Sequence, residues 1–283
     1  MKIKKWNRVI RFVKMHGLGN DFMIIDARDI KPKLDQNIIK HLANRNLGVG
    51  FDQLVLIYES RSPEADCFLK FWNYDGSISS TCGNASRCVA DLIMSEKRLS
   101  RAILETEVGL LLCKKNKNEI ISVNMGEPKW KWNDIPLAIE CNTLHLPLEG
   151  DPVATNMGNP HCTFFVDDVH SVDLCNFGKI FENHQLFPNR TNVQIAQILQ
   201  KNTIRVKVWE RGVGKTLASG SSSCAVAVAA FRRGLTTKNT KIILDGGELL
   251  IDWSDDGIWM SGETKKVFEG TVSDDFFGYL DRV

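Results

Sequence analysis

Short apolar runs, many of them β-branched, recur along the chain and predict β-strands. In the first half these runs are FMIIDA, QLVLIYE, CFLKFWN, GLLLCKK and IISVNMG, and turn signals such as YDGS separate them. Helical spacing is less common. Residues 35–48 combine an acidic N-cap residue, Asp35, with apolar spacing and a final glycine, Gly48, so we expect an amphipathic helix there.

Two further segments are apolar on nearly every face. VADLIM follows Cys82 after a few small or polar residues, and AVAVAAF follows Ser219 in the same way. A helix without a polar face is buried in a protein core. We therefore expect two central helices, each surrounded by its own group of strands.

The chain also repeats itself at long range. Cys82 and Ser219 lie 137 residues apart in the similar stretches STCGNASRC and TLASGSSSC, and Trp72 and Trp209 are separated by the same 137 residues. A third pair, HGLGNDFMIID and TNMGNPHCTFFVDD, follows the same order. Several features at nearly one offset predict a duplicated domain of about half the chain.

This duplication predicts the fold class and the domain organisation. We expect an α+β fold of two pseudo-symmetric, structurally similar halves, each with strands around a central buried helix. The halves are residues 1–126 and 127–265, and residues 266–283 are expected to pack back on the first half. The active site is expected in the cleft between the halves.

Composition and charge are typical of a soluble globular protein. Hydrophobic residues make up 43% of the sequence, charged residues 25%, and the formal net charge is +2. So small a charge argues against a nucleic-acid or membrane-surface partner, and no apolar run approaches the roughly 20 residues that span a bilayer. The basic N-terminal segment lacks the apolar centre of a secretion signal, so we expect a cytoplasmic protein.

The eight cysteines do not indicate a metal site, because the sequence has no CxxC pair. A chain of this length without a secretion signal is also a poor match to a disulfide scaffold. We expect most of the thiols to be reduced and buried. Cys67 and Cys113 are expected in the core because they lie in strand-like apolar runs.

Cys82 is the residue whose position most strongly suggests chemistry. The residues after it suit an exposed helix start, where N–H groups bind anions and lower the pKa of a thiol; a buried cysteine without a role is the alternative. Two such helix starts at one cleft would bind a carboxylate between them. One group could then remove the proton from the adjacent carbon while another protonates the opposite face, which requires neither a metal nor pyridoxal phosphate.

Other polar residues fall at strand ends or turns, where such a cleft needs them. Amide side chains there can bind amino or carboxylate groups or can cap their own turns; they are Asn20, Asn73, Asn159 and Asn192. Glu210 and Arg211 follow an apolar strand and can clamp a zwitterion, with a solvated ion pair as the alternative. His161 can orient a proton-transfer group or serve a structural role.

Blocks along nearly the whole chain resemble the diaminopimelate epimerase family. They are FVKMHGLGNDFMIID, FDQLVLI, FWNYDGSISSTCGNASRC, MGNPHC, RTNVQIAQIL and WERGVGKTLASGSSSCAVA, in the family's order. The resemblance implies a cofactor-independent amino-acid epimerase of two similar α+β halves. The implied substrate is LL-diaminopimelate, which is converted to the meso form for lysine and peptidoglycan synthesis.

The resemblance also implies roles for individual residues. Cys82 and the position of Ser219 would form the acid/base pair, with His161 and Glu210 beside them. The substrate would be bound by Asn20, Gln53, Asn73, Gly83, Asn84, Asn159, Asn192, Glu210, Arg211, Gly220 and Ser221. Family members commonly form dimers through a face near the C-terminal part, where Phe268 stands in place of a tyrosine, so we expect a homodimer.

Two positions depart from the family pattern. Ala85 stands where the family usually has glycine, which a helical backbone tolerates. Ser219 stands where the family has its second catalytic cysteine, and because a hydroxyl is far less acidic than a thiol, we expect impaired turnover. The substitution is open to three explanations: it is engineered, it marks a natural loss of activity, or it marks another activity, such as that of a one-base dehydratase or an epimerase of another amino acid. A non-catalytic amino-acid-binding relative is a further alternative.

Overall fold

The computed structural model describes residues 9–30, 32–79, 82–273 and 276–277. Its internal contacts divide the chain into two units. Unit 1 comprises residues 1–121 and 263–283, and unit 2 comprises residues 122–262. Unit 2 is therefore one continuous segment, whereas unit 1 is assembled from two segments.

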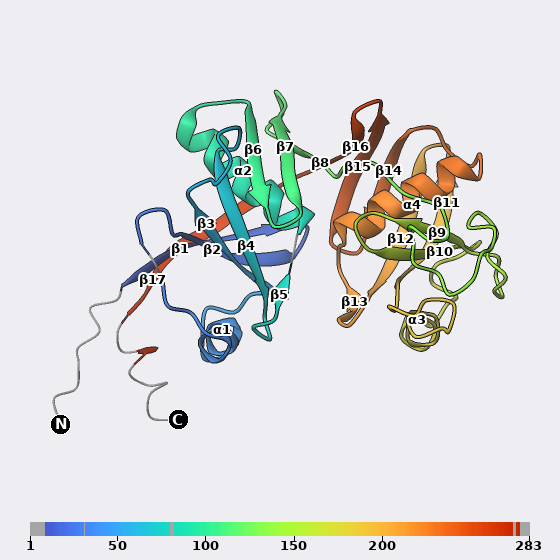
Figure 1. The fold of residues 1–283 in the computed structure, drawn as a ribbon, viewed down its shortest axis with the longest axis horizontal. Helices are drawn as coiled ribbons and strands as arrows, with labels where there is room; N and C mark the ends of the chain where they lie inside the picture. Colours follow the sequence, from blue (N-terminus) through green and yellow to red (C-terminus); the bar gives the residue numbers. More distant parts are fainter. Residues whose placement is uncertain (1–8, 31, 80–81, 274–275, 278–283) are drawn as a thin grey trace. The chain divides into compact units, whose positions relative to one another are not determined.

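Unit 1 is a sheet with two helices (Figure 1). β1 pairs in antiparallel fashion with β2 and β17, β2 lies parallel to β3, and β3 is antiparallel to β4. β4 pairs antiparallel with β5 and parallel with β6, which is antiparallel to β7. The elements are β1 (Ile10–Gly17), β2 (Asn20–Asp26), α1 (Gln36–Ala43), β3 (Gln53–Tyr58), β4 (Cys67–Asn73), β5 (Ile78–Ser79), α2 (Gly83–Lys97), β6 (Arg101–Thr106), β7 (Gly109–Lys115) and β17 (Lys265–Val272).

Unit 2 repeats this order of elements and this sense of pairing. β9 is antiparallel to β10, β10 parallel to β11, β11 antiparallel to β12, β12 antiparallel to β13 and parallel to β14, and β14 antiparallel to β15. β16 adds to β15 and also pairs with β8. The elements are β8 (Ile121–Asn124), β9 (Val153–Asn156), β10 (Pro160–Phe165), α3 (Leu174–Glu182), β11 (Asn192–Gln200), β12 (Thr203–Glu210), β13 (Gly214–Thr216), α4 (Gly220–Arg232), β14 (Asn239–Leu244), β15 (Gly247–Ser254) and β16 (Gly257–Gly262).

The long apolar helix of each unit is buried among its strands. α2 packs on β1, β2, β6 and β7, and α4 packs on β9, β10, β11 and the strands after it. Every residue of α4 from Ser222 to Ala230 is buried. The prediction of two similar α+β halves, each with strands around a central helix, is confirmed.

The end predicted for α1 is wrong. The Asp35 side chain caps the helix by accepting a hydrogen bond from Ile38 N at 2.8 Å, as expected. The helix then ends at Ala43 and not at Gly48. The side-chain oxygen Oδ1 of Asn44 accepts hydrogen bonds from Asn46 N and Leu47 N, at 2.9 and 3.0 Å, and closes a turn that competes with further helix.

The sequence pattern did not predict α3, which has an interior glycine that disfavours helix. The glycine is there because the Trp209 ring packs against it. A Cβ added at Gly178 would lie 2.3 Å from Trp209 Cγ. Aromatic contacts also hold the helix in place, since the Phe177 ring packs edge-on and the Phe181 ring packs at a tilt against Phe164 of β10.

Cys67 and Cys113 lie in the core, as predicted, with exposed fractions of 0% and 3%. Burial raises the pKa of the Cys67 thiol to about 12, so this thiol stays protonated. Of the other cysteines, Cys175 on α3 is the exposed one, and none of the eight forms a disulfide in the described structure.

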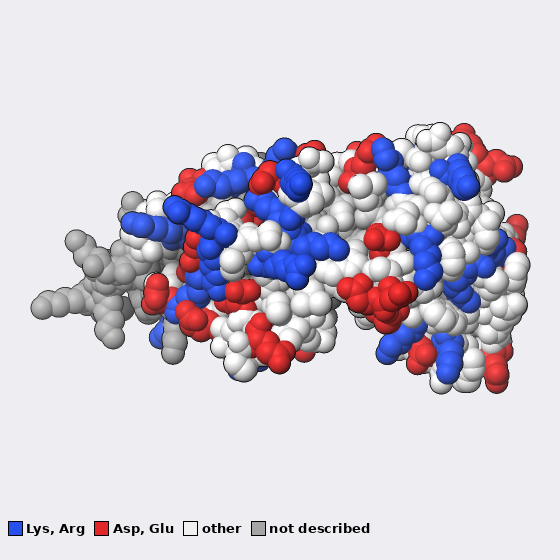
Figure 2. Space-filling model, turned by 90° about the horizontal axis from the view of Figure 1, so that it is seen from above, with Lys and Arg blue, Asp and Glu red and all other residues white. Residues whose placement is uncertain are grey.

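The surface carries charges of both signs. Lys and Arg side chains are mixed with Asp and Glu on the face drawn in Figure 2. In the part of the chain that the structure describes, no helix is both long enough and apolar enough to cross a membrane.

Candidate active site

The start of α2 holds Cys82 at the N-cap position. Its backbone is extended, with φ −153°, and its Sγ accepts a hydrogen bond from the Ala85 N–H at 3.5 Å. The side chain is half-buried, so the sulfur is not sealed in the core. An N–H directed at sulfur from a helix start favours the thiolate, which is the basic and nucleophilic form.

Two asparagines beside this helix start form a fixed chain of amides. Asn84 Nδ2 donates to Asn20 Oδ1 at 3.2 Å, and Asn20 Nδ2 donates to the carboxylate of Asp52 at 2.9 Å. Because a carboxylate only accepts, it sets the orientation of Asn20 and, through Asn20, that of Asn84. Asp52 was not among the site residues predicted from the sequence.

A second amide pair joins β3 and β4. Gln53 and Asn73 are directly opposite each other, and Gln53 Nε2 donates to Asn73 Oδ1 at 2.9 Å. The buried oxygens Gln53 Oε1 and Asn84 Oδ1 find no hydrogen-bond partner among the described residues. Buried acceptors of this kind normally meet a donor, so both oxygens suit a ligand with N–H groups, such as an ammonium group.

Charged side chains, some buried and some exposed, support this amide chain. Lys14 donates to Asp21 at 2.5 Å and to the Gly50 carbonyl, and Arg45 bridges Asp21 and Asp52. Burial alone would raise the pKa of Asp21, but hydrogen bonds from Arg45 and Lys14 outweigh it and lower that pKa to about 2. Asp21 therefore stays ionised as an acceptor.

In unit 2, the start of α4 corresponds to the start of α2. Ser219 is its N-cap residue, with an extended backbone at φ −141°. Its side chain makes no capping hydrogen bond within the described structure and is 4% exposed. Gly220 and Ser221 begin the helix, so their N–H groups lie among its free first-turn donors.

His161 on β10 is completely buried. Each of its two ring nitrogens contacts the side-chain amide of another residue. Nε2 lies 2.7 Å from Asn159 Oδ1, and Nδ1 lies 3.0 Å from Gln194 Nε2. Burial, and to a smaller degree the charge of Arg211, lowers the pKa of His161 to about 3. The imidazole is therefore neutral at physiological pH.

The Glu210–Arg211 turn is held by Asn192. Asn192 Oδ1 accepts a hydrogen bond from Arg211 N at 3.0 Å, and its Nδ2 donates to the Pro160 carbonyl at 2.9 Å. Asn192 therefore joins β10, β11 and this turn, and its amide oxygen is already engaged. Glu210 ends β12 and is half-buried.

Glu182 holds the same turn from the other side and was also missed. This buried carboxylate of α3 accepts hydrogen bonds from Trp209 Nε1 at 2.7 Å and from Gly212 N at 2.8 Å. Glu182 was not predicted because α3, the helix that carries it, was not predicted. Gln194 was missed as well, although a glutamine inside the apolar strand NVQIAQIL is a signal for a buried polar contact.

The predicted site residues thus gather into two half-sites, one in each unit. The first half-site is Asn20, Gln53, Asn73, Cys82, Gly83 and Asn84. The second half-site is Asn159, His161, Asn192, Glu210, Arg211, Ser219, Gly220 and Ser221. Each lies at the start of a central helix and at neighbouring strand ends, which supplies a reactive group, N–H donors and amides together.

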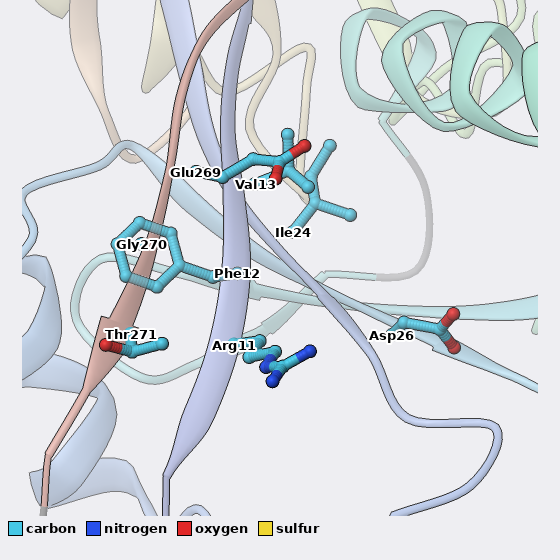
Figure 3. Close-up of a pocket in the computed structure, with 8 residues that line it drawn as sticks. All are labelled: Arg11, Phe12, Val13, Ile24, Asp26, Glu269, Gly270 and Thr271. Carbon is cyan, nitrogen blue, oxygen red and sulfur yellow. The ribbon is translucent and has the colours of Figure 1, made fainter.

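A separate hollow of about 430 Å³ lies over β1, β2 and β17 (Figure 3). Arg11, Asp26 and Glu269 supply its charged lining. It contains no residue of either half-site and neither helix start, so it is not the candidate active site.

Comparison with known proteins identifies the family of this chain. The family model for diaminopimelate epimerase matches residues 12–131 and 153–267, which include both helix starts. The chain belongs to the diaminopimelate epimerase family. A diaminopimelate epimerase from Rhodospirillum centenum is 46% identical over 94% of this chain and 93% of the relative. One from Gluconobacter oxydans is 45% identical over 93% of this chain and 99% of the relative.

Solved structures support the fold assignment for this family member. A predicted epimerase from Pseudomonas aeruginosa has a TM-score of 0.67 at 13% identity, and covers 93% of this chain and 99% of its own. A hydroxyproline epimerase from Agrobacterium vitis, with trans-4-hydroxy-L-proline bound, has a TM-score of 0.66 at 12% identity and covers 95% and 94%. The family and the class of isomerase predicted from the sequence are confirmed.

Proposed function

We propose that this chain interconverts LL- and meso-diaminopimelate by proton transfer at the α-carbon, in the cytoplasm, as a step of lysine and peptidoglycan synthesis. The observation that supports this most is the equivalence of Cys82 and Ser219. Each is the N-cap residue of the central helix in one of two units with the same order of elements. In this proposal the two half-sites act on opposite faces of one carbon.

The first proton transfer uses Cys82. Its thiolate takes the α-proton, and the electron pair of the broken C–H bond delocalises into the substrate carboxylate. The N–H groups at the helix starts stabilise the charge that develops there. A proton delivered from the Ser219 side to the opposite face completes the inversion, and the reverse reaction exchanges the two roles.

The bound substrate is a zwitterion, and the half-sites offer groups for both of its charges. The unpartnered oxygens of Gln53 and Asn84 accept hydrogen bonds from the ammonium group. The N–H groups of Gly220 and Ser221 and the amide of Asn159 donate to the carboxylate. Glu210 and Arg211 bind the distal amino-acid end, where Arg211 can contact a carboxylate with two parallel hydrogen bonds.

Ser219 makes this a slow enzyme in the proposed scheme. Its hydroxyl is a far weaker acid than a thiol, whose reference pKa is about 8.5. Exchange of the α-proton through Cys82 therefore continues more readily than full inversion. General acid–base groups typically contribute about 10²–10⁴-fold, and a loss in this range is expected relative to a cysteine at the same position.

The experiment compares the chain with its Ser219→Cys and Ser219→Ala variants on LL-diaminopimelate in D₂O. Deuterium at the α-carbon is followed by mass spectrometry, and the meso product by chiral chromatography. We expect Ser219→Cys to form meso product about 10²–10⁴-fold faster, while all three proteins incorporate deuterium. Ser219→Ala shows whether the native hydroxyl contributes.

Three outcomes would contradict parts of this proposal. A Ser219→Cys protein that is folded yet neither exchanges the proton nor forms meso product would refute the function. Equal epimerisation by the native chain and Ser219→Cys would refute the account of Ser219. Loss of ammonia or water from a hydroxylated amino acid, assayed alongside, would favour the one-base dehydratase instead.

We further propose that the chain forms a homodimer through β17. Val267 and Phe268 on this strand are 56% and 46% exposed, and Phe268 packs edge-on against Phe12 of β1 at a ring distance of 5.8 Å. Successive side chains of a strand point to opposite faces, so the exposed Phe268 ring, on the side of Phe12, is the apolar group that favours an interface. The hollow in Figure 3, which Phe12, Glu269 and Gly270 help to line, gives these strands a shape into which a partner's side chains can fit.

A further inference from the structure

Gln194 is a buried amide that joins three elements of unit 2. It lies on β11 and is 0% exposed. Its Nε2 donates to His161 Nδ1 on β10 and to Ser222 Oγ on α4, both at 3.0 Å. Its Oε1 accepts from Thr163 Oγ1 at 3.1 Å. In this arrangement both N–H groups and the oxygen of the amide are engaged.

We infer that Gln194 is a positioning residue that holds His161 in the tautomer with its proton on Nε2 and thereby turns the Asn159 amide nitrogen toward the substrate carboxylate. This inference deepens the proposed function and rests on it for the identity of the substrate. The tautomer itself does not depend on turnover and can be measured separately.

The orientation passes from one side chain to the next. Because Gln194 donates to Nδ1, that nitrogen must carry a lone pair, and a neutral imidazole then has its proton on Nε2. Nε2–H donates to Asn159 Oδ1 at 2.7 Å. With its oxygen engaged in this way, Asn159 offers its two N–H groups, which suit an anionic carboxylate and not an ammonium group.

The surroundings keep His161 neutral while Gln194 selects the tautomer. The ring has no exposed surface, and Arg211 is the charged group that acts on it. Both disfavour the imidazolium, but neither distinguishes Nδ1–H from Nε2–H. The amide of Gln194 does distinguish them, and reversing that amide would place the proton on Nδ1.

Gln194 also ties the ring to the helix that carries Ser219. Ser222 is the third residue of α4, and Ser219 precedes the helix as its N-cap. Movement of the amide would therefore disturb both His161 and the start of α4. This explains why a polar side chain is retained in the middle of a buried strand.

The test is nuclear magnetic resonance of the full chain labelled with ¹⁵N in its histidine rings. The chain has six histidines, and a His161→Asn variant identifies the signals of His161. Protonated and unprotonated ring nitrogens have well-separated shifts. We expect Nε2 protonated and Nδ1 unprotonated, without titration between about pH 5 and 8. A proton on Nδ1, or on both nitrogens, would overturn the inference.

Two variants test whether Gln194 is the cause. Gln194→Glu presents a carboxylate to Nδ1, so we expect the proton to move to Nδ1 or the ring to become charged. Gln194→Met removes the donor at similar size, so we expect a mixture of tautomers. Gln200→Glu, at the exposed end of the same strand, is the matched control and should leave the His161 signals unchanged. If both Gln194 variants keep the native tautomer, Gln194 does not set it.

The link to the substrate is tested with Gln194→Glu in the Ser219→Cys chain. Because Asn159 would turn its oxygen toward the carboxylate, we expect KM for diaminopimelate to rise at least tenfold while kcat changes less. A switched tautomer with an unchanged KM would refute the role of Asn159. An inactive Ser219→Cys chain that retains the Nε2–H tautomer would refute the proposed function and leave the assignment of Gln194 standing.

Discussion

At the scale of single residues, Cys82 and Ser219 occupy the same place in two helix caps and differ in one atom, sulfur or oxygen. Both have extended backbones and both precede a buried helix. The Cys82 sulfur accepts a hydrogen bond from an N–H group of its helix. The Ser219 side chain makes no such capping hydrogen bond within the described residues. The electrostatic support for a negative charge is therefore stronger on the cysteine side.

This asymmetry predicts that Cys82 carries the remaining chemistry. Replacing it with alanine should lower deuterium incorporation into LL-diaminopimelate by about 10²–10⁴-fold, because no thiolate is left at either helix start. Cys175→Ser, which alters an exposed thiol on α3, is the control and should exchange at the native rate. Undiminished exchange in Cys82→Ala would assign the base to another residue.

Residue roles could be predicted where the signal is local. The caps at Cys82 and Ser219 depend on neighbouring small and polar residues, and their positions follow from the sequence. The neutral state of His161 does not, because it depends on burial and on Arg211, 50 positions further along the chain. Asn192 was expected to bind substrate, yet its oxygen accepts from the backbone of Arg211, a contact that only the folded turn reveals.

At the scale of elements, the strands and the two central helices follow their apolar patterns, whereas α3 and the end of α1 do not. α3 contains Gly178 because the Trp209 ring occupies the space of a side chain, and that contact is tertiary. α1 stops early because the Asn44 side chain binds nearby N–H groups. Local side-chain competition and packing from distant strands are the two effects that periodicity does not include.

The hairpin of β1 and β2 should give the stability of the protein a distinct acid dependence. The pKa of Asp21 is lowered to about 2, below its ordinary value of 3.8, so its carboxylate stabilises the folded state above that ordinary value. The contribution, on the order of 2 kcal/mol, is lost as pH falls from about 4 toward 2. Urea unfolding across this range should show the decline.

Asp21→Asn is the variant that tests this assignment. It should be less stable than the native chain at neutral pH, since Lys14 and Arg45 lose their shared partner, and its stability should fall less steeply between about pH 4 and 2. Asp252→Asn, on an exposed position of β15, should follow the native curve. Equal acid slopes in the native chain and Asp21→Asn would show that other carboxylates dominate.

At the scale of the whole molecule, duplication explains both the fold and the paired half-sites. A strand end, a turn and a helix start recur together at the common offset of 137 residues, so the architecture could be predicted from the sequence. The hydrogen-bond partners within each half-site could not, since they join segments such as Asn20 and Asn84 that lie far apart in the chain.

The proposed homodimer is tested by sedimentation at several concentrations. Phe268→Glu places a charge on β17 and should weaken dimerisation at least tenfold, because an unpaired charge is costly in an apolar interface. Leu250→Glu is the control, since Leu250 is similarly exposed, at 53%, but lies on β15. Circular dichroism establishes that both variants are folded. A native chain that is monomeric, or a Phe268→Glu protein that dimerises normally, would refute the proposed face.

The pairing of β1 with β17 also affects the order in which the protein can mature on the ribosome. Ile10 lies opposite Val272 in this pair. The first strand of unit 1 therefore cannot pair with β17 until β17 has been translated, which happens after all of unit 2. Unit 2 is continuous and can close as soon as its own segment has emerged. Although its first strands are synthesised earliest, unit 1 is therefore completed last, and nascent β1 keeps an unpaired edge until β17 has been translated.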